Sequence, residues 1–256
     1  MQFLKVALVA AYAANVARAW TADQCSNLIN VLQLDPSVKI LSTTPYPDNS
    51  TIVDPYNLAY PSPVPDLPAF CRVYANISTS PTSRTLFEVW LPLNTWNNRT
   101  MTVGNGGGNG AINLGQLGQG IRAGFATIST DCGHNSSSID GSWEALGPEV
   151  ATDFGWRSIH LSTLYGREIL TQFYGTNYSY SYYVGCSSGG KQGYRELTLF
   201  PETFDGSASL FYAFLIEDAL SVPLHLNGIT SMLFRFTFKR INSLPQTKRL
   251  VTSPPN

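Results

Sequence analysis

Tyr182-Tyr183-Val184-Gly185-Cys186-Ser187-Ser188-Gly189-Gly190 predicts a buried strand that runs directly into a serine flanked by glycines, and residues 191–200 are compatible with a helix. Gly185, Ser187 and Gly189 form the G-x-S-x-G pattern of a nucleophile elbow, in which the serine occupies a sharp turn between a strand and a helix. Side chains two residues before and after the serine would clash in that turn, which explains both glycines. A glycine-rich turn that contains serines is the simpler alternative, and the strand and helix around it favour the elbow.

Hydrophobic periodicity places other elements around this stretch. Alternating residues 84–92, residues 101–103 and residues 124–129 predict strands, and apolar residues at helical spacing predict a helix over 153–174. Residues 40–70 are rich in Pro, Ser, Thr and Asp and predict an irregular arm. With the strand at 180–184, this order predicts an α/β fold, a mostly parallel sheet of α/β-hydrolase type with a nucleophile elbow.

The glycine run at 104–110 follows a short predicted strand. It lacks the Gly-Lys-Ser/Thr ending of a phosphate-binding P-loop. Esterases place an oxyanion-hole loop at such a position, so the backbone N–H groups near Gly106 and Gly107 are expected to join that of Ser188. A purely structural glycine turn is the alternative.

Several ordered blocks together resemble the fungal tannase and feruloyl esterase family. They are Gly104–Gly110, Ser129–Asn135, Asp140–Trp143, Asp153–Gly155, Gly185–Gly193 and Phe200–Gly206, and the resemblance covers roughly residues 20–209. It implies a serine carboxylic ester hydrolase with Ser187 as nucleophile. It also implies that feruloyl or galloyl esters, as small molecules or linked to polysaccharide, are the substrates.

The resemblance bears on the four cysteines that follow residue 19. Four cysteines allow three pairings, and the residues alone do not choose among them. The family pattern implies a Cys25–Cys71 disulfide. In that family the Cys beside the nucleophile pairs with a Cys beside the catalytic His, and no His-Cys pair exists here, so Cys186 is expected to lack its partner. A Cys132–Cys186 bridge stays possible.

The first residues and the composition indicate secretion. Residues 1–19 have an apolar run followed by Ala17-Arg18-Ala19, the pattern of a signal peptide with cleavage before Trp20. Five glycosylation sequons agree with this. They begin at Asn49, Asn76, Asn98, Asn135 and Asn177. The net charge is −1 with no basic block, and no other segment is apolar enough to be transmembrane, so neither nucleic acid nor a membrane is expected as a partner.

The rest of the triad is the missing part of this pattern. In this fold the acid and then the base follow the serine, and His225 is the only later histidine. Thirty-eight residues from Ser187 to His225 leave too little chain for two further strand–helix units, and Asp205 is therefore not expected to form a triad with His225. His160 lies on the helix predicted over 153–174 and is expected to be a surface or packing residue. His134 is expected to make a loop hydrogen bond or to touch substrate.

Beyond residue 210 the resemblance ends, and we interpret residues 211–256 as a non-family tail at the end of a truncated gene model, with a divergent C-terminal region as the alternative. Residues 20–210 are then a partial catalytic domain that is weakly active or inactive as given. No residue spacing predicts a metal site, and the calcium that the family carries in its lid has no counterpart, so no cofactor is expected. The alternative is a non-catalytic secreted protein that binds phenolics or glycans.

Overall fold

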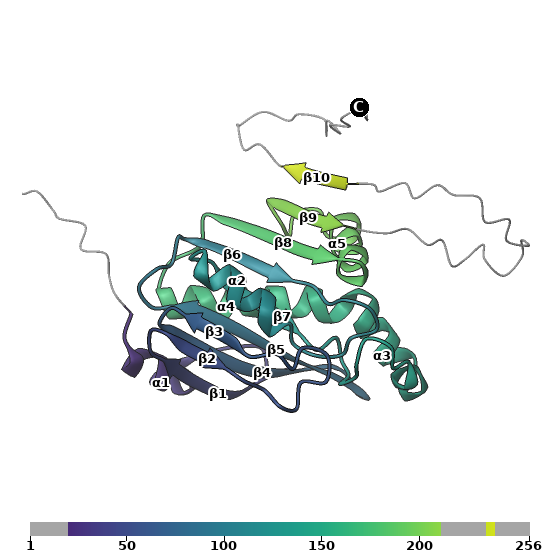
Figure 1. Ribbon diagram of the computed structural model, residues 1–256, viewed down its shortest axis with the longest axis horizontal. Helices are drawn as coiled ribbons and strands as arrows, with labels where there is room; N and C mark the ends of the chain where they lie inside the picture. The colour runs from purple at the N-terminus through teal and green to yellow at the C-terminus, as the bar shows by residue number, and fades with distance from the viewer. Residues whose placement is uncertain (1–19, 211–233, 239–256) are drawn as a thin grey trace, which may run out of the picture.

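The computed structural model describes residues 20–210 and 234–238 (Figure 1). The predicted signal peptide and most of the predicted tail lie outside the described residues. An eight-stranded sheet runs in the order β1-β4-β5-β7-β6-β8-β9-β10. Its strands are β1 (Val38–Tyr46), β4 (Phe70–Ser80), β5 (Ser83–Pro92), β7 (Ala126–Thr130), β6 (Arg99–Val103), β8 (Tyr180–Cys186), β9 (Gly206–Leu210) and β10 (Phe234–Phe238).

The sheet is parallel where it carries the predicted elbow. The pairs β7/β6, β6/β8 and β8/β9 are parallel, and those from β1 to β7 on the other side are antiparallel. A short turn joins β4 to β5, and such a connection permits only antiparallel neighbours. The predicted α/β class of hydrolase type is thus confirmed, with the parallel pairing concentrated in the half that follows β5.

Helices cover both faces of the sheet. On one face lie α1 (Ala22–Val31), α4 (Ser158–Tyr174) and α5 (Ser188–Leu199). On the other lie α2 (Leu114–Arg122) and a small hairpin of β2 (Ser50–Ile52) and β3 (Val64–Leu67). Between α2 and α4 the chain forms a 3₁₀ turn (Ser142–Leu146), α3 (Pro148–Thr152) and a π-helical turn (Asp153–Arg157).

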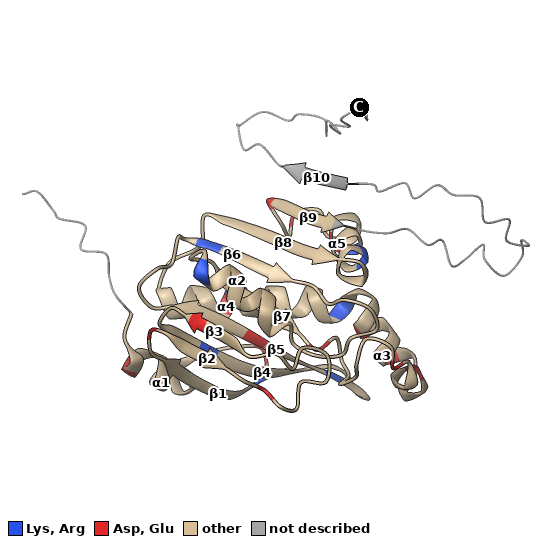
Figure 2. Cartoon of the chain, in the orientation of Figure 1, with Lys and Arg blue, Asp and Glu red and all other residues tan. Residues whose placement is uncertain are grey.

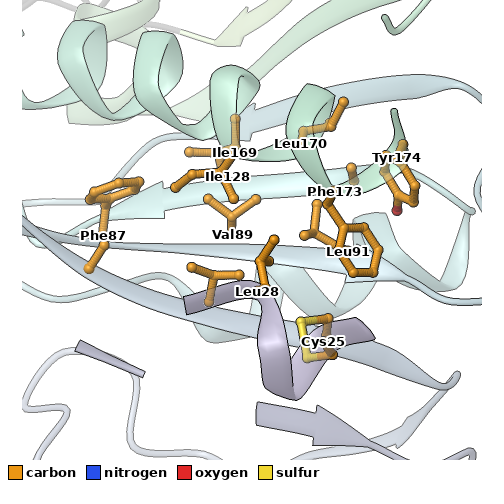
Figure 3. Packing of buried hydrophobic residues seen from close by; sticks show 14 of the residues in the cluster. Cys25, Leu28, Phe87, Val89, Leu91, Ile128, Ile169, Leu170, Phe173 and Tyr174 are labelled. Carbon is orange, nitrogen blue, oxygen red and sulfur yellow. A yellow bond between two sulfur atoms is a disulfide. The ribbon is translucent and has the colours of Figure 1, made fainter. Parts of the chain in front are cut away.

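Alternation along β5 decides which side chain faces which helix layer. Phe87, Val89 and Leu91 join the core beneath α4, with Ile128 and Ile169 among its other members (Figure 3). The intervening Trp90 joins the second core, beneath α2. This is the two-faced pattern that the sequence predicts for residues 84–92.

Two local predictions need correction. Residues 40–70 are not an irregular arm, because they contain most of β1 and the β2–β3 hairpin. Backbone pairing with β4 outweighs the poor strand propensity there, and β1 tolerates Pro45 because it is an edge strand. The helix predicted over 153–174 becomes α-helical only at Ser158, because residues 153–157 form the π-helical turn.

The predicted Cys25–Cys71 disulfide is confirmed and ties α1 to β4 inside the core. Charged residues of both signs are sparse along the chain (Figure 2). Among the described residues, no helix is both long and apolar enough to cross a bilayer.

We expect the Cys25–Cys71 bridge to contribute substantially to stability. The residues it joins are 46 positions apart. Closing a loop of that length in the unfolded chain corresponds to about 4 kcal/mol by the chain-entropy model. Cys25→Ser with Cys71→Ser should lower the free energy of unfolding in urea by about 2–4 kcal/mol. Cys186→Ser, which removes an exposed free thiol, is the control. An equal, small effect of both changes would contradict the assignment.

Candidate active site at the β8–α5 turn

Ser187 occupies a strained turn between β8 and α5. Its backbone has φ 57° and ψ −119°, a conformation that residues with a side chain rarely adopt. The flanking glycines make the turn possible, since a Cβ on Gly185 would lie 2.4 Å from the carbonyl oxygen of Gly189. A side chain at Gly185 would therefore clash, as the sequence predicts. The structure has the strand–turn–helix context that a nucleophile elbow requires.

The glycine run packs directly against this turn. The Gly104 N–H donates to the carbonyl of Val184 at 2.9 Å, which extends the β6/β8 pairing to the residue before Gly185. A Cβ on Gly104 would lie 2.2 Å from the hydroxyl of Tyr183 and 2.8 Å from the Cα of Gly189. Glycine is thus required on both sides of the contact, and the loop lies beside Ser187 as the oxyanion-hole interpretation needs.

The three predicted oxyanion donors differ in their present partners. Ser188 is the first residue of α5, so its N–H has no acceptor within the helix. The Gly106 N–H donates to the hydroxyl of Tyr60 at 2.9 Å. No described residue accepts a hydrogen bond from the Gly107 N–H. Ser188 and Gly107 therefore have unengaged N–H groups. The Gly106 N–H would have to break its hydrogen bond to the Tyr60 hydroxyl before it could bind a substrate oxygen.

The described histidines are occupied elsewhere. His134 lies 3.3 Å from the Cys132 carbonyl through Nδ1 and 3.1 Å from the Gly108 carbonyl through Nε2, and its ring stacks on Trp143. Burial lowers the pKa of His134. This agrees with the expected loop hydrogen bonds.

His160 lies on α4 and packs against α5 and the residue that follows it, in agreement with the expected packing role. Its Nδ1 lies 3.2 Å from the Glu196 carboxylate, and its ring stacks on Phe200. Within residues 20–210, no histidine side chain hydrogen-bonds Ser187, so no general base stands beside the serine there.

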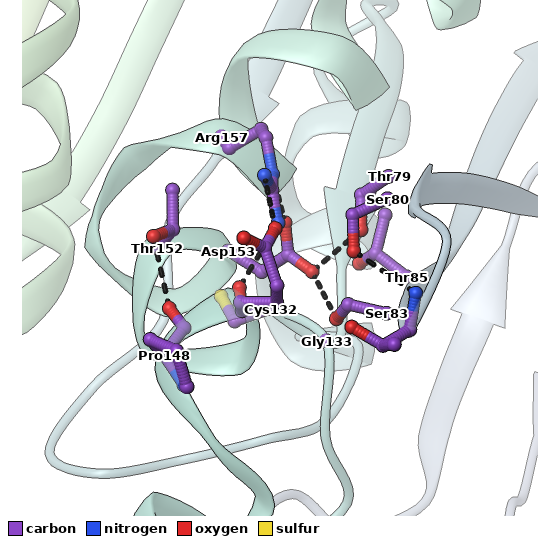
Figure 4. Close-up of polar contacts among 12 residues, drawn as sticks. Thr79, Ser80, Ser83, Thr85, Cys132, Gly133, Pro148, Thr152, Asp153 and Arg157 are labelled. Carbon is purple, nitrogen blue, oxygen red and sulfur yellow. Dashed lines mark hydrogen bonds and ion pairs between the residues drawn. The ribbon is translucent and has the colours of Figure 1, made fainter.

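Two buried carboxylates support the loop that carries His134. Asp153, in the π-helical turn, accepts hydrogen bonds from Thr79 and Ser83 at 2.6 Å and from Arg157 at 2.5 Å (Figure 4). Its Cβ lies 2.9 Å from where a Cβ on Gly133 would stand. The π-helical turn therefore packs against this loop at Gly133.

Asp131, at the start of the same loop, ties the loop to β5. One of its oxygens accepts from Thr85 Oγ1 and from the N–H groups of Leu86 and Gly133, at 2.7 to 3.0 Å. Burial nevertheless raises its pKa to about 7, and the charge of Asp153 adds to the effect. The carboxyl is thus expected to bind its proton near neutral pH.

The remaining predicted residues are distributed as follows. Cys132 is buried and Cys186 exposed, and both are free, so the Cys132–Cys186 bridge is not formed. Four sequon asparagines are exposed, and Asn76 is half-buried within β4. Within the described ranges, no three His, Cys, Asp or Glu side chains lie close enough together to hold a metal ion.

Sequence reasoning gave no role to three residues that hold the site. Tyr60 reaches the glycine loop from the segment predicted to be irregular. Asn105 and Gln192 lie inside quoted motifs and are fully buried. Asn105 and Gln192 are polar residues within the two glycine-rich motifs that pack together, and this position is the signal that could have identified them. No comparable signal exists for Tyr60.

Replacement of Gly185 tests the turn. Gly185→Ala should destabilise the protein by about 1–3 kcal/mol, because its Cβ meets backbone atoms that have little freedom to move. Gly155→Ala is the matched control, since nothing lies within 4 Å of its added Cβ. Urea unfolding of both variants measures the difference, and a Gly185→Ala protein as stable as the control would exclude this packing.

Asp131 should make stability depend on pH. Its folded-state pKa of about 7 exceeds the unfolded value of about 3.9, so between these values the folded chain holds a proton that the unfolded chain has lost. The free energy of unfolding should therefore fall as pH rises from 4 to 7, by at most about 1.4 kcal/mol per pH unit from this group. Asp131→Asn should flatten this part of the profile, whereas exposed Glu168→Gln should not. Parallel profiles for all three proteins would refute the assignment.

Comparison with known proteins agrees with this geometry. The probable feruloyl esterase B-1 of Neosartorya fischeri is 35% identical over 212 residues, which cover 80% of this chain and 39% of that protein. Feruloyl esterase B of Aspergillus niger is 41% identical over 136 residues, 53% of this chain and 26% of that protein. The chain therefore spans between a quarter and two-fifths of the length of these relatives.

Solved structures show the same partial correspondence. The crystal structure of feruloyl esterase B from Aspergillus oryzae matches with a TM-score of 0.66 at 33% identity, over 73% of this chain and 36% of that one. Tannin acyl hydrolase from Aspergillus niger, at 23% identity and a TM-score of 0.55, shares the fold over the same fractions. Residues 71–213 match the sequence profile of the tannase and feruloyl esterase family. The chain belongs to the tannase and feruloyl esterase family.

Proposed function

We propose that this protein is a secreted carboxylic ester hydrolase in which Ser187 is the nucleophile. The observation that carries the proposal is the backbone of Ser187, held at φ 57° and ψ −119° between β8 and α5 with the glycine loop packed against it. A strained non-glycine residue at a strand–helix junction is the feature that distinguishes a nucleophile elbow from an ordinary glycine turn.

The chemistry follows from the groups around Ser187. Its hydroxyl oxygen attacks the ester carbonyl, and the N–H groups of Ser188 and Gly107 stabilise the negative charge that develops on the carbonyl oxygen. The alcohol leaves, and water then releases the acid from the acyl-serine. A base must accept the hydroxyl proton, and no described histidine is available for this, so we place the base and its carboxylate outside the described residues.

Aromatic esters are the proposed substrates. Relatives at 35% and 41% identity are named feruloyl esterases, and a protein that shares the fold is a tannin acyl hydrolase. We therefore propose feruloyl esters, free or linked to polysaccharide, with galloyl esters second. The disulfide between Cys25 and Cys71 and the four exposed sequon asparagines support secretion.

Residues 20–210 would form only part of the catalytic domain. Without a base and its carboxylate, a serine hydrolase retains about 10³–10⁴-fold catalysis over water from its oxyanion hole and substrate binding. We therefore propose that the 256-residue chain hydrolyses methyl ferulate only slowly. Tight binding of phenolics or glycans without any turnover would instead support the non-catalytic alternative.

Ser187→Ala tests the nucleophile in a polypeptide that also contains the downstream segment of the full transcript. The kcat of this variant on methyl ferulate should fall by about 10⁶, because alanine has no hydroxyl that can attack the ester. Ser26→Ala, which removes the hydroxyl of an exposed serine on α1, is the control. Hydrolysis that survives Ser187→Ala, or that disappears in Ser26→Ala, would overturn the assignment.

A further inference from the structure

Three buried residues close a ring of hydrogen bonds behind the glycine loop. The side-chain amide of Gln192 donates to the Cys132 sulfur at 3.2 Å, and the Cys132 thiol donates to Asn105 Oδ1 at 3.1 Å. The backbone N–H of Asn105 donates to Gln192 Oε1 at 3.1 Å, which completes the ring. Each residue is at most 1% exposed, so water does not compete for these bonds.

The direction of each bond in the ring is determined by its surroundings. Asn105 Nδ2 donates to the carbonyls of Ala111 and Thr130, at 2.7 and 3.0 Å, so Oδ1 must face the thiol. Gln192 Oε1 faces a backbone N–H, so Nε2 must face Cys132 and the more distant carbonyl of Phe154. The thiol must be protonated to donate, and burial raises the pKa of Cys132 well above its usual range.

The ring joins three segments that meet at Ser187. Gln192 lies on α5, five residues after the serine, and Cys132 follows β7 at a backbone φ of 60°. Asn105 lies between Gly104, which pairs with β8, and Gly106, which precedes the unengaged N–H of Gly107. A shift of α5 relative to the glycine loop would therefore break a ring bond and move the Gly107 N–H relative to Ser187.

We propose that Gln192 is a positioning residue that, through Cys132 and Asn105, sets the separation between the glycine loop and Ser187. The role rests on the proposed function of Ser187. Gln192 does not touch the reacting atoms; its side chain holds the peptide between Gly104 and Asn105, while α5 presents the N–H of Ser188. Cys132 serves as a donor and an acceptor, which a serine hydroxyl can replace and an alanine cannot.

Opening the ring tests the proposal in two measurements. Gln192→Met keeps the volume and removes the polar atoms, and Cys132→Ala opens the ring with the loss of one sulfur. Both should raise amide hydrogen exchange in the peptide covering residues 104–110 by about tenfold. Cys132→Ser should restore protection close to that of the unaltered chain. Gln172→Met changes an exposed glutamine whose side chain bonds the backbone of Gln33; it is the matched control and should leave exchange in this peptide unchanged.

Kinetics in the extended polypeptide give the second measurement. With kcat expressed per Ser187 labelled by a fluorophosphonate, Gln192→Met and Cys132→Ala should lower kcat on methyl ferulate by about 10². KM should stay nearly constant, and Cys132→Ser should recover most of kcat. Folded Gln192→Met and Cys132→Ala proteins with unchanged exchange and kcat would refute the role. If the unaltered protein shows no Ser187-dependent hydrolysis, the proposed function fails, while the exchange data still decide whether the ring holds the loop.

Discussion

The close approach of two glycine backbones, Gly185 and Gly189, is the constraint on which the site depends. Their separation leaves no room for a Cβ, so the chain can reverse within three residues and hold Ser187 at a positive φ. A third glycine, Gly104, also packs against Gly189 and brings the glycine loop into contact with the turn. The strain at Ser187 persists because β8, α5 and the glycine loop all oppose its relaxation.

The rest of the structure keeps these backbones in register. Apolar cores on both faces of the sheet fix α4 and α2, and the Cys25–Cys71 disulfide closes the outer part of one core. Nearer the site, hydrogen bonds and ion pairs hold the chain, because the loops that follow the strands are not fixed by apolar packing alone. Asp131 and Asp153 support the loop after β7, and the ring through Gln192 links that loop to α5.

Much of the fold could be predicted because its signals are local. The alternation in β5 and the glycines around Ser187 report their structure within a few residues. Contacts between distant segments were not predictable in this way: β1 pairs with β4 despite a weak strand pattern, and Tyr60 reaches Gly106 from 46 positions away. The resemblance to a family supplied the disulfide, which residue spacing alone left open. The ring through Gln192 joins residues 27 to 87 positions apart, so no local pattern predicts it.

Acylation of Ser187 by an activated aryl ferulate, such as the p-nitrophenyl ester, tests the central claim most directly. The activated leaving group needs no acid, and water or hydroxide can accept the serine proton in a slow reaction, so acylation then depends on the serine and the N–H groups around it. Peptide mass spectrometry of the 256-residue chain should find the feruloyl group on Ser187 and not on the adjacent Cys186 or Ser188. A folded protein that takes up no feruloyl group, or carries it elsewhere, would contradict the account.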